Sequence, residues 1–392
     1  MSPSEPERTE SRQYSFPQEF EPQIEALLSG LGYSLSKPGA LAEAVRKLSG
    51  YYIQNQSGAT PWHERWAQAA YLAYFFPLNW ARSQAVCDEG RRAGFFNELD
   101  SFIDFGSGLS AYSFLLDNFK AGIFVEPGDE ARRLHQRLVE ETAGDANLRT
   151  GSPSYEWHPR VRLIDQTNRL LGVFSYVLTE LPSLPQWGFD VEALLIVEPS
   201  TRDDGRRLQE LRGQLIDRGF YPWAPCTHAH ACPLLVHSKH DWCHDRIHFE
   251  QPAWFEEIEK LLPMKNRTIT FSYLLMRKTK PPHMARTHRS QAPEAEGPAG
   301  LIASPAPETI VGDAVLARLV GDQLEEKGKT RQLVCQGPER QFLSWLHRNG
   351  PLPGLKRGHL VQMPEKQDQR GNEIRVGPES HVALVRKYPL SY

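Results

Sequence analysis

Three of the five cysteines in this 392-residue chain lie within eighteen residues of each other, at Cys226, Cys232 and Cys243. Five residues separate the first two and ten separate the second and third. Pro225 precedes Cys226 and Pro233 follows Cys232, and proline interrupts regular secondary structure. The three thiols can therefore converge without the constraint of a helix. This cluster predicts a metal site.

Residue spacing leaves three interpretations of the cluster open. Unpaired buried cysteines behave as small apolar side chains, but Pro, His and Asp are unusual neighbours for a core. Zinc sites use cysteine pairs two to four residues apart, so zinc would need a histidine such as His228 or His244. An iron–sulfur cluster takes four thiolates, often beside a proline, and Cys335 can supply the fourth from the C-terminal region. We favour a [4Fe–4S] cluster, with zinc as the alternative, and expect Cys87 to be packed in the helical region.

A second candidate site follows a short apolar strand at residues 101–105. The string Asp104-Phe105-Gly106-Ser107-Gly108 ends this strand and opens a helix. Glycines at such a turn let backbone N–H groups approach a ligand. Glu126 ends the next strand, where a carboxylate can bind the two hydroxyls of a ribose. Asp104, Gly106, Ser107, Gly108 and Glu126 are therefore candidate residues for binding S-adenosylmethionine, and a plain strand-to-helix turn is the alternative.

No catalytic residue stands out beside this loop. The segment 176–181, expected at the end of the fourth strand, has neither an Asn-Pro-Pro-aromatic string nor a cysteine. Glu180 is a weak candidate for a general base, and a solvated acid is the competing interpretation. Leu109 stands where a smaller residue is common in methyltransferases, and its bulk would crowd the cofactor.

The elements that position these residues form an α/β protein. Short apolar runs alternate with helix-length segments and predict the strands of a doubly wound sheet. These runs span residues 101–105, 122–125, 161–164, 174–178 and 193–197. We expect a flexible leader (1–17), an N-terminal helical region (18–97), an α/β domain (98–278) with a metal-binding insertion (223–250), a disordered linker (279–307) and a small β-rich C-terminal domain (308–392).

Composition limits the classes of function. A net charge of −3 argues against a uniformly basic surface that coats nucleic acid, yet residues 331–392 hold ten Lys and Arg against five Asp and Glu. No apolar segment is long enough to span a membrane, and the start of the chain lacks the apolar core of a secretory signal. Five cysteines do not form a secreted disulfide framework, which favours a reducing compartment.

Several motifs occur together in a known order. They are Asp104-Phe105-Gly106-Ser107-Gly108, Val197-Glu198-Pro199-Ser200-Thr201 with Gly205, Ala224-Pro225-Cys226-Thr227-His228 with Cys232-Pro233-Leu234, Asp241-Trp242-Cys243-His244 and Val334-Cys335-Gln336-Gly337. Together they resemble the methyltransferase-like assembly factors of the mitochondrial small ribosomal subunit and their bacterial relatives.

This resemblance implies a class I methyltransferase-like fold, a [4Fe–4S] cluster held by Cys226, Cys232, Cys243 and Cys335, and partners in small-subunit ribosomal RNA and ribosomal proteins. We also expect a monomer without a membrane partner, in the bacterial cytoplasm or, in a eukaryote, the mitochondrial matrix. Two functions compete. One is an assembly factor that contacts RNA phosphates through Arg340, Arg348, Lys356 and Arg357. The other is an S-adenosylmethionine-dependent rRNA methyltransferase.

Overall fold

The structure of the chain is a computed structural model. The residues that the structure describes are 5–55, 59–143, 145, 148, 151, 153–161, 169–285, 315–349, 354–364, 366–377, 380 and 382–385. Among the helices in these ranges, none has the length and hydropathy to cross a membrane.

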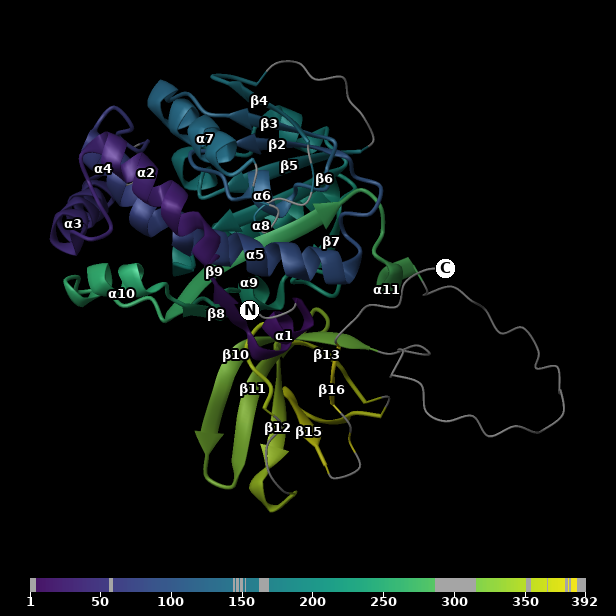
Figure 1. Cartoon of the computed structure of the whole chain (residues 1–392). Coiled ribbons are helices and arrows are strands. Elements are labelled where there is room, and N and C mark those ends of the chain that lie inside the picture. Colours follow the sequence, from purple (N-terminus) through teal and green to yellow (C-terminus); the bar gives the residue numbers. More distant parts are fainter. Residues whose placement is uncertain are drawn as a thin grey trace, which may run out of the picture.

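A nine-stranded sheet forms the larger part of the molecule (Figure 1). Its strands are β1 (Gln13–Ser15), β2 (Ser101–Phe105), β3 (Ala121–Val125), β4 (Ser154–His158), β5 (Leu170–Ser175), β6 (Ala193–Glu198), β7 (Tyr221–Ala224), β8 (Asp245–Glu250) and β9 (Thr268–Arg277). The spatial order is β1-β8-β9-β6-β5-β2-β3-β4, with β7 also paired to β9. Strands β2 to β6 are parallel, and β9 runs antiparallel to β6. This is the predicted doubly wound α/β sheet.

Both faces of the sheet are covered because its central strands are apolar on both sides. Leu195 and Val197 of β6 belong to one buried cluster, while Leu194 and Ile196 belong to another. Helices α5 (Phe76–Ala93) and α7 (Asp129–Glu141) pack on the first face, and α8 (Arg202–Asp217) packs on the second. A continuous apolar run of this kind is typical of a parallel strand between two helical layers.

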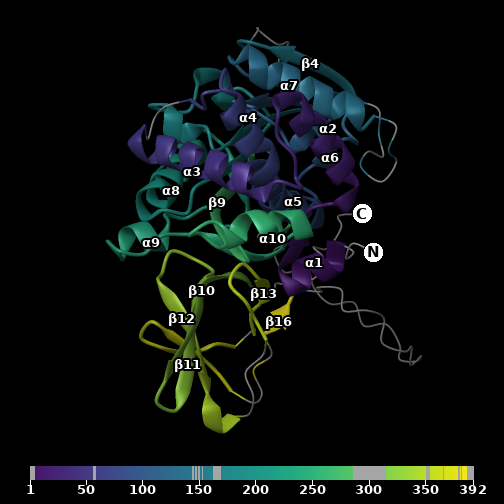
Figure 2. The same ribbon diagram turned by 60° about the vertical axis from the view of Figure 1, so that its left-hand side comes forward.

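The remaining helices lie around this core (Figure 2). They are α1 (Glu5–Ser11), α2 (Glu21–Leu31), α3 (Pro38–Gln54), α4 (Arg65–Ala70), α6 (Tyr112–Leu115), α9 (Pro233–Val236), α10 (Ala253–Lys260) and α11 (Pro282–Ala285), with a π-helical turn at Tyr71–Phe75 between α4 and α5. The helices α2 to α5 fall within the range 18–97 that we expected to be helical.

The leader that we expected to be flexible is structured from Glu5 onward. Its strand β1 pairs in parallel with β8, and the Tyr14 and Phe16 side chains are buried. Arg12 is also buried and forms an ion pair with Asp245. The expectation of a flexible leader was wrong here because the polar residues before Arg12 hid the alternating aromatic side chains that follow.

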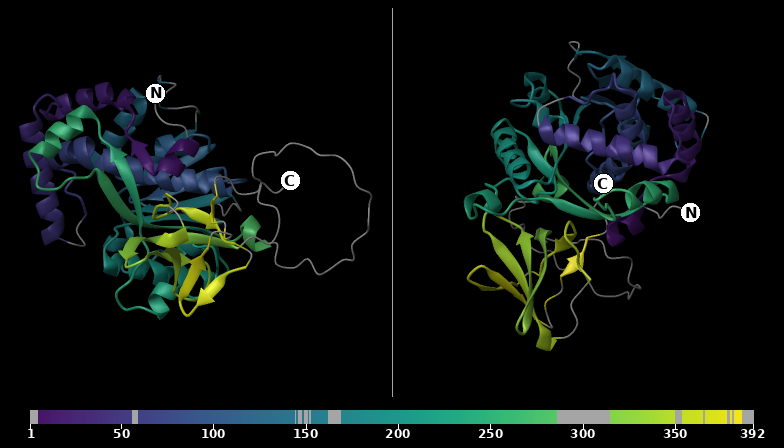
Figure 3. Two further views of the ribbon diagram at one scale, coloured as in Figure 1. Left: turned by 90° about the horizontal axis from the view of Figure 1, so that it is seen from below. Right: turned by 90° about the vertical axis from the view of Figure 1, so that its left-hand side faces the viewer.

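A second sheet of seven strands lies beyond β8 and α9 (Figures 1 and 3). Its strands are β10 (Leu316–Glu326), β11 (Lys329–Cys335), β12 (Gln341–Leu346), β13 (Leu360–Gln362), β14 (Asp368–Arg370), β15 (Glu373–Val376) and β16 (Ala383–Leu384), in the order β14-β15-β12-β11-β10-β13-β16. It has its own apolar cluster, centred on Leu319, Leu343 and Ile374. Most of the predicted linker, from residue 286 onward, lies outside the described residues.

A buried ionic network joins the second sheet to the first. Arg318 of β10 is 2% exposed and pairs with Glu89 of α5, which also pairs with Arg92. The Arg318 guanidinium donates to the carbonyl of Pro225 at 3.0 Å and to that of Gly358 at 2.8 Å. The two arginines hold the pKa of Glu89 well below its ordinary value, although burial acts in the opposite direction. The two sheets are therefore joined by buried charged side chains, each of which is stabilised by an oppositely charged partner.

Candidate functional site

The structure brings the four cysteines of the predicted metal site together at the junction of the two sheets. Cys226 follows β7, Cys232 precedes α9, Cys243 precedes β8, and Cys335 is the last residue of β11. All four are free thiols; Cys232 is half-buried and the others are buried. Cys243 and Cys335 share an apolar cluster with Leu234, against which Cys232 packs. Cys87 is buried in the helical core, as expected.

The thiols are close enough to influence one another's ionisation. Burial raises the pKa of Cys335, and the negative charges of Cys226 and Cys232 raise it further. The pKa of Cys243 is raised in the same way, by burial first and then by the other three cysteines. Ionisation of these thiols is therefore unfavourable. A bound cation would offset this, because a positive charge nearby stabilises a thiolate in an apolar site.

Helix α8 supplies such a charge. Arg212 is 2% exposed, and its Nε donates to the Cys226 Sγ at 3.1 Å. The same guanidinium donates to the carbonyls of His228 and His230, which fixes the loop between Cys226 and Cys232. Arg206, one turn and a half earlier, donates to the carbonyls of Ser238 and Asp241. Two arginines of one helix thus shape the cysteine-bearing loop.

The motif around Glu198 supports Cys243. A side chain at Gly205 would come within 2.7 Å of the Trp242 ring, so glycine lets this ring pack against α8. Trp242 Nε1 donates to the Ser200 carbonyl at 2.8 Å, and the Ser272 hydroxyl donates to the Cys243 carbonyl at 2.9 Å.

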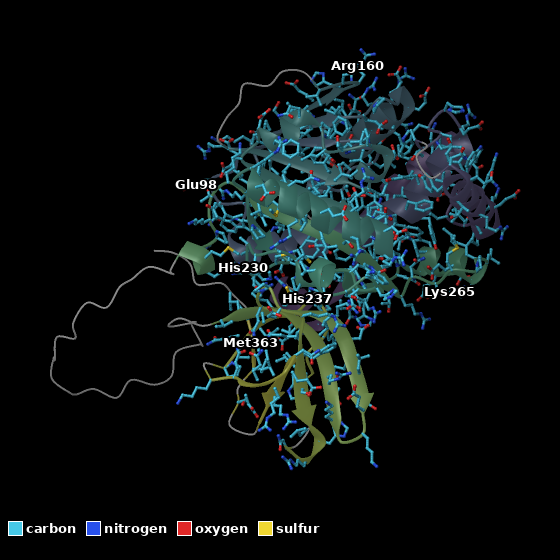
Figure 4. All side chains as sticks on the ribbon, turned by 180° about the vertical axis from the view of Figure 1, so that it is seen from behind. Glu98, Arg160, His230, His237, Lys265 and Met363 are labelled. Carbon is cyan, nitrogen blue, oxygen red and sulfur yellow. The ribbon has the colours of Figure 1, made fainter. Side chains whose placement is uncertain are left out.

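Two histidines of the loop face the second sheet: His228 lies beside the Cys335 thiol, and the His237 Nε2 lies 3.2 Å from the Pro338 carbonyl. Figure 4 shows His230 and His237 at the boundary between the sheets, near Met363 of the second one. His228 Nε2 lies 3.3 Å from the Cys335 Sγ, at hydrogen-bonding distance. Burial lowers the pKa of His228 to about 3, so its ring is neutral at physiological pH. Its Nδ1 atom is buried without a hydrogen-bond partner among the described residues.

A single bound metal ion is not supported by this arrangement. Across the described residues, no group of three or more His, Cys, Asp or Glu side chains could hold a metal ion. One zinc ion needs four ligands that converge on one point. The structure therefore does not support the zinc alternative. The donor set consists of three buried thiols and one half-buried thiol, with a guanidinium on the sulfur of Cys226.

The residues of the glycine loop lie together at the ends of β2 and β3. Gly106 and Gly108 have φ angles of 69° and 49°, and a side chain at Gly106 would collide with Val177 at 2.4 Å. The N–H groups of Gly106 and Ser107 both donate to the Val125 carbonyl. Asp104 is 2% exposed, and burial raises its pKa to about 7.

Glu126 is bonded to the loop itself. Its Oε2 accepts from the Gly108 N–H at 3.1 Å, and its Oε1 accepts from the Gly128 N–H at 2.8 Å. The indole of Trp62 lies against both glycines, since side chains at Gly108 and Gly128 would come within 3.2 Å and 3.0 Å of it. The indole therefore lies against the two backbone turns that were expected to face S-adenosylmethionine. Sequence reasoning missed Trp62, because its position in space cannot be predicted from a loop residue.

Glu180 lies beyond the strand that we expected to carry it. The prediction placed the fourth strand at 174–178, whereas β5 spans Leu170–Ser175 and Glu180 ends a 3₁₀ turn at Leu178–Glu180. The residue as a whole is exposed at the surface, although protein surrounds part of its carboxyl group. Partial burial of the carboxyl group, and then the charge of Glu126, raise its pKa to about 7. This value suits a proton acceptor, but no described residue pairs with Glu180 in a way that would orient it for catalysis.

Glu198, at the end of β6, is a buried acid whose chemistry the sequence reasoning did not anticipate. It is 3% exposed, and its Oε1 accepts from the Leu178 N–H at 3.0 Å. Its Oε2 has no hydrogen-bond partner within the described part of the chain. Burial raises the pKa of Glu198 to about 8, so the carboxyl group is largely protonated at neutral pH. It lines a surface pocket with Thr179, Asp204 and Arg207.

The contribution of Glu198 to folding stability is expected to fall as the pH rises from about 4.5 to about 8. A carboxyl group with a raised pKa keeps its proton in the folded state over a pH range in which the unfolded chain has lost it. For Glu198 that range runs from its ordinary value of 4.5 to about 8, and complete ionisation costs roughly 2–5 kcal/mol. Glu198→Gln should flatten the fall in thermal melting temperature between pH 6 and pH 9. The control Glu210→Gln, on the exposed rim of the same pocket, should leave the slope unchanged, and an unchanged slope in Glu198→Gln would contradict the assignment.

Comparison with known proteins gives a family for most of the chain. Residues 65–340 match the family described as mitochondrial small ribosomal subunit Rsm22. The matched range contains the nine-stranded sheet from β2 onward, the glycine loop and all four cysteines of the junction. No curated protein sequence matches the chain significantly.

Solved structures show only a distant likeness. The methyltransferase domain of METTL16 matches 52% of this chain and 69% of its own at 13% identity and a TM-score of 0.30. An rRNA methylase from Streptococcus thermophilus matches 50% of this chain and 95% of its own at 12% identity and a TM-score of 0.28. TrmK from M. capricolum, in complex with S-adenosyl-homocysteine, matches 49% and 68% at 11% identity and a TM-score of 0.26. Scores this low support no conclusion about function.

Proposed function

Because this chain belongs to the family described as mitochondrial small ribosomal subunit Rsm22, we propose that it is an assembly factor that binds the RNA of a small ribosomal subunit. The methyltransferase-like sheet is the scaffold of this factor, and the second sheet contributes to its RNA contacts. We propose that the protein is a monomer. It would act beside ribosomal proteins where small subunits mature, in the bacterial cytoplasm or the mitochondrial matrix.

A [4Fe–4S] cluster at the junction of the sheets is part of the proposal. Cys226, Cys232, Cys243 and Cys335 would hold it, and the observation that supports it is the meeting of these four thiols across the two sheets. Cys335 is separated from Cys243 by 91 intervening residues in the sequence, so a cluster would turn metal binding into folding energy for the second sheet. With four thiolate ligands, its role is structural.

Arg212 and His228 would complete the surroundings of the cluster. A guanidinium that donates to the Cys226 sulfur and a ring nitrogen close to the Cys335 sulfur both lower the energy of the thiolate form. The Arg212 side chain is already held by two loop carbonyls, so it needs no rearrangement to serve the cluster.

The proposed RNA contacts differ from those expected from the sequence. Arg340 pairs with Asp241 at 2.7 Å and Arg357 pairs with Asp322 at 3.2 Å, while Lys356 donates to the Ser11 carbonyl at 2.8 Å. The contacts of Arg340 and Lys356 cross the junction, whereas the Arg357 pair lies within the second sheet. Arg348 is exposed, and it lies at the far tip of the second sheet, where His347 N donates to the carbonyl of Gly328.

Lys327 is exposed at the same tip, in the turn between β10 and β11. Lys327 and Arg348 are thus two cations at the end of the molecule farthest from α7 (Figure 1). They are the contacts to RNA phosphates that we now propose.

RNA binding should therefore depend on salt and on this tip. We expect the double variant Lys327→Glu, Arg348→Glu to bind small-subunit rRNA roughly 5- to 20-fold more weakly than wild type, with a log–log salt slope shallower by about 2, since each lost phosphate contact removes about one unit. Fluorescence anisotropy on an rRNA fragment over a series of salt concentrations measures both quantities.

The matched control is Arg133→Glu on α7, which is also exposed and lies at the opposite end of the molecule. It should bind like wild type. A wild-type protein whose RNA affinity does not change with salt would argue against the assembly-factor proposal, and equal losses in both variants would argue against the tip.

The second candidate function, methyl transfer from S-adenosylmethionine to rRNA, has less support. It requires the loop at Gly106 and Gly108 to be open to the cofactor, and the Trp62 indole lies on that loop.

A further inference from the structure

We propose that the Trp62 side chain fills the position at which a methyltransferase-like sheet would bind a nucleoside. It thereby excludes S-adenosyl cofactors from this chain. In a sheet of this kind, the nucleoside lies between the glycine turn after the first strand and the acid after the second. Here these two elements are Gly108 and Glu126 with its neighbour Gly128. The Trp62 ring contacts both glycines: its Cζ2 would lie 3.2 Å from a side chain at Gly108, and its Cδ1 3.0 Å from one at Gly128.

The size and character of the indole fit this role. Trp62 is a flat aromatic bicycle, as adenine is, and it is 7% exposed. Tyr71 extends the aromatic surface, with its ring centroid 4.8 Å from that of Trp62 and its hydroxyl 3.7 Å from the place of a Gly108 side chain. A nucleoside could enter only by displacing both rings from a close-packed interior.

Several hydrogen bonds hold the occupant in position. Buried Gln68 donates from Nε2 to the Trp62 carbonyl at 2.7 Å, and the Trp62 N–H donates to the Thr60 carbonyl at 2.8 Å. Asn79 donates to the Tyr71 hydroxyl at 3.1 Å. The Trp62 backbone is therefore held by α4 and by its own segment, and the Tyr71 side chain beside it is held by α5.

The hydrogen bonds of Glu126 also fit a site from which a nucleoside is excluded. Each of its carboxyl oxygens already accepts one backbone N–H, from Gly108 and from Gly128. The carboxylate that would bind the ribose hydroxyls instead joins the two backbone turns on which the indole lies. Burial raises the pKa of Glu126, as expected for an acid that no solvent or ribose reaches.

The test is the binding of S-adenosyl-homocysteine to the full-length protein by isothermal titration calorimetry. Wild type should show no saturable binding. Trp62→Ala removes the ring and should gain binding at least about tenfold tighter than any residual wild-type affinity. Trp62→Leu, which keeps an apolar side chain and guards against a folding defect, should gain binding to a smaller extent. Circular dichroism confirms that each variant is folded.

Trp66→Ala is the matched control. Trp66 lies on α4, four residues away. Its Nε1 donates to Glu64, and the Lys47 Nζ lies 4.1 Å from the centre of its ring. Its loss should not create binding. Saturable binding to wild type overturns the proposal, as does a folded Trp62 variant that binds no better than wild type. The outcome is independent of RNA binding and of the metal content, so it can fail while the proposed function stands.

Discussion

Replacing Cys335 by serine is expected to loosen the second sheet from the rest of the molecule. Cys335 is the only candidate ligand contributed by that sheet, and it lies beside Arg318 in the β10–β11 pair. If a cluster joins the sheets, loss of one thiolate removes metal-coupled folding energy, which for structural metal sites is of the order of 10 kcal/mol. Amide hydrogen exchange should rise by at least about 100-fold in β10 and β11, while β2 to β6 remain protected.

Cys87→Ala is the matched control, since Cys87 is equally buried but lies in α5, away from the junction. It should leave exchange in the second sheet unchanged and cost only the small packing loss of a sulfur atom, about 1 kcal/mol. Equal exchange in wild type and Cys335→Ser would mean that no metal centre joins the sheets.

The second large effect is expected for Arg318→Met. The side chain is fully buried, and the substitution leaves Glu89 with one cation in place of two, and the Pro225 and Gly358 carbonyls without a donor. Breaking one partner out of a buried ion pair typically costs 3–5 kcal/mol. Urea unfolding should show this loss as a lower midpoint, with the second sheet unfolding first.

Arg370→Met provides the comparison on the same sheet. Arg370 pairs with Asp368 at 3.2 Å, and both side chains are more than half exposed, so its loss should change the free energy of unfolding by less than about 0.5 kcal/mol. If the two variants were equally stable, the buried network would not be what joins the sheets.

The sequence predicts the architecture well where hydrophobic periodicity is strong. The run Ala193–Val197 indicates a strand buried on both faces, and β6 occupies it. Position along a strand was harder to predict. The fourth strand begins at Leu170, four residues before the predicted start, because Gly172 is tolerated inside a buried strand and Thr179 and Glu180 form a turn.

Long-range partners explain the other differences. The parallel pairing of β1 with β8 joins Tyr14 to Phe249, a contact that local composition does not encode. The predicted strand at 161–164 lies mostly outside the described residues, and Ser154–His158 pairs with β3 instead. The arginines predicted to bind RNA are basic in sequence, but Asp241 and Asp322 neutralise two of them in space.

The two candidate sites remain predictions, and the structure shows how their residues lie. Cysteine spacing and the proline neighbours pointed to four thiols that the fold does bring together. The contact between Arg212 of α8 and the Cys226 sulfur could not be predicted from the sequence. The residues of the glycine loop are adjacent as expected, yet their occupant is Trp62, which comes from an earlier segment of the chain.

The most direct test of the four-cysteine junction is the metal content of the full-length protein purified without oxygen. A [4Fe–4S] cluster predicts iron and acid-labile sulfide near four each per chain, with a broad visible absorbance band that is lost in Cys335→Ser and kept in Cys87→Ala. A colourless protein, whether free of metal or carrying one zinc per chain, would contradict the account.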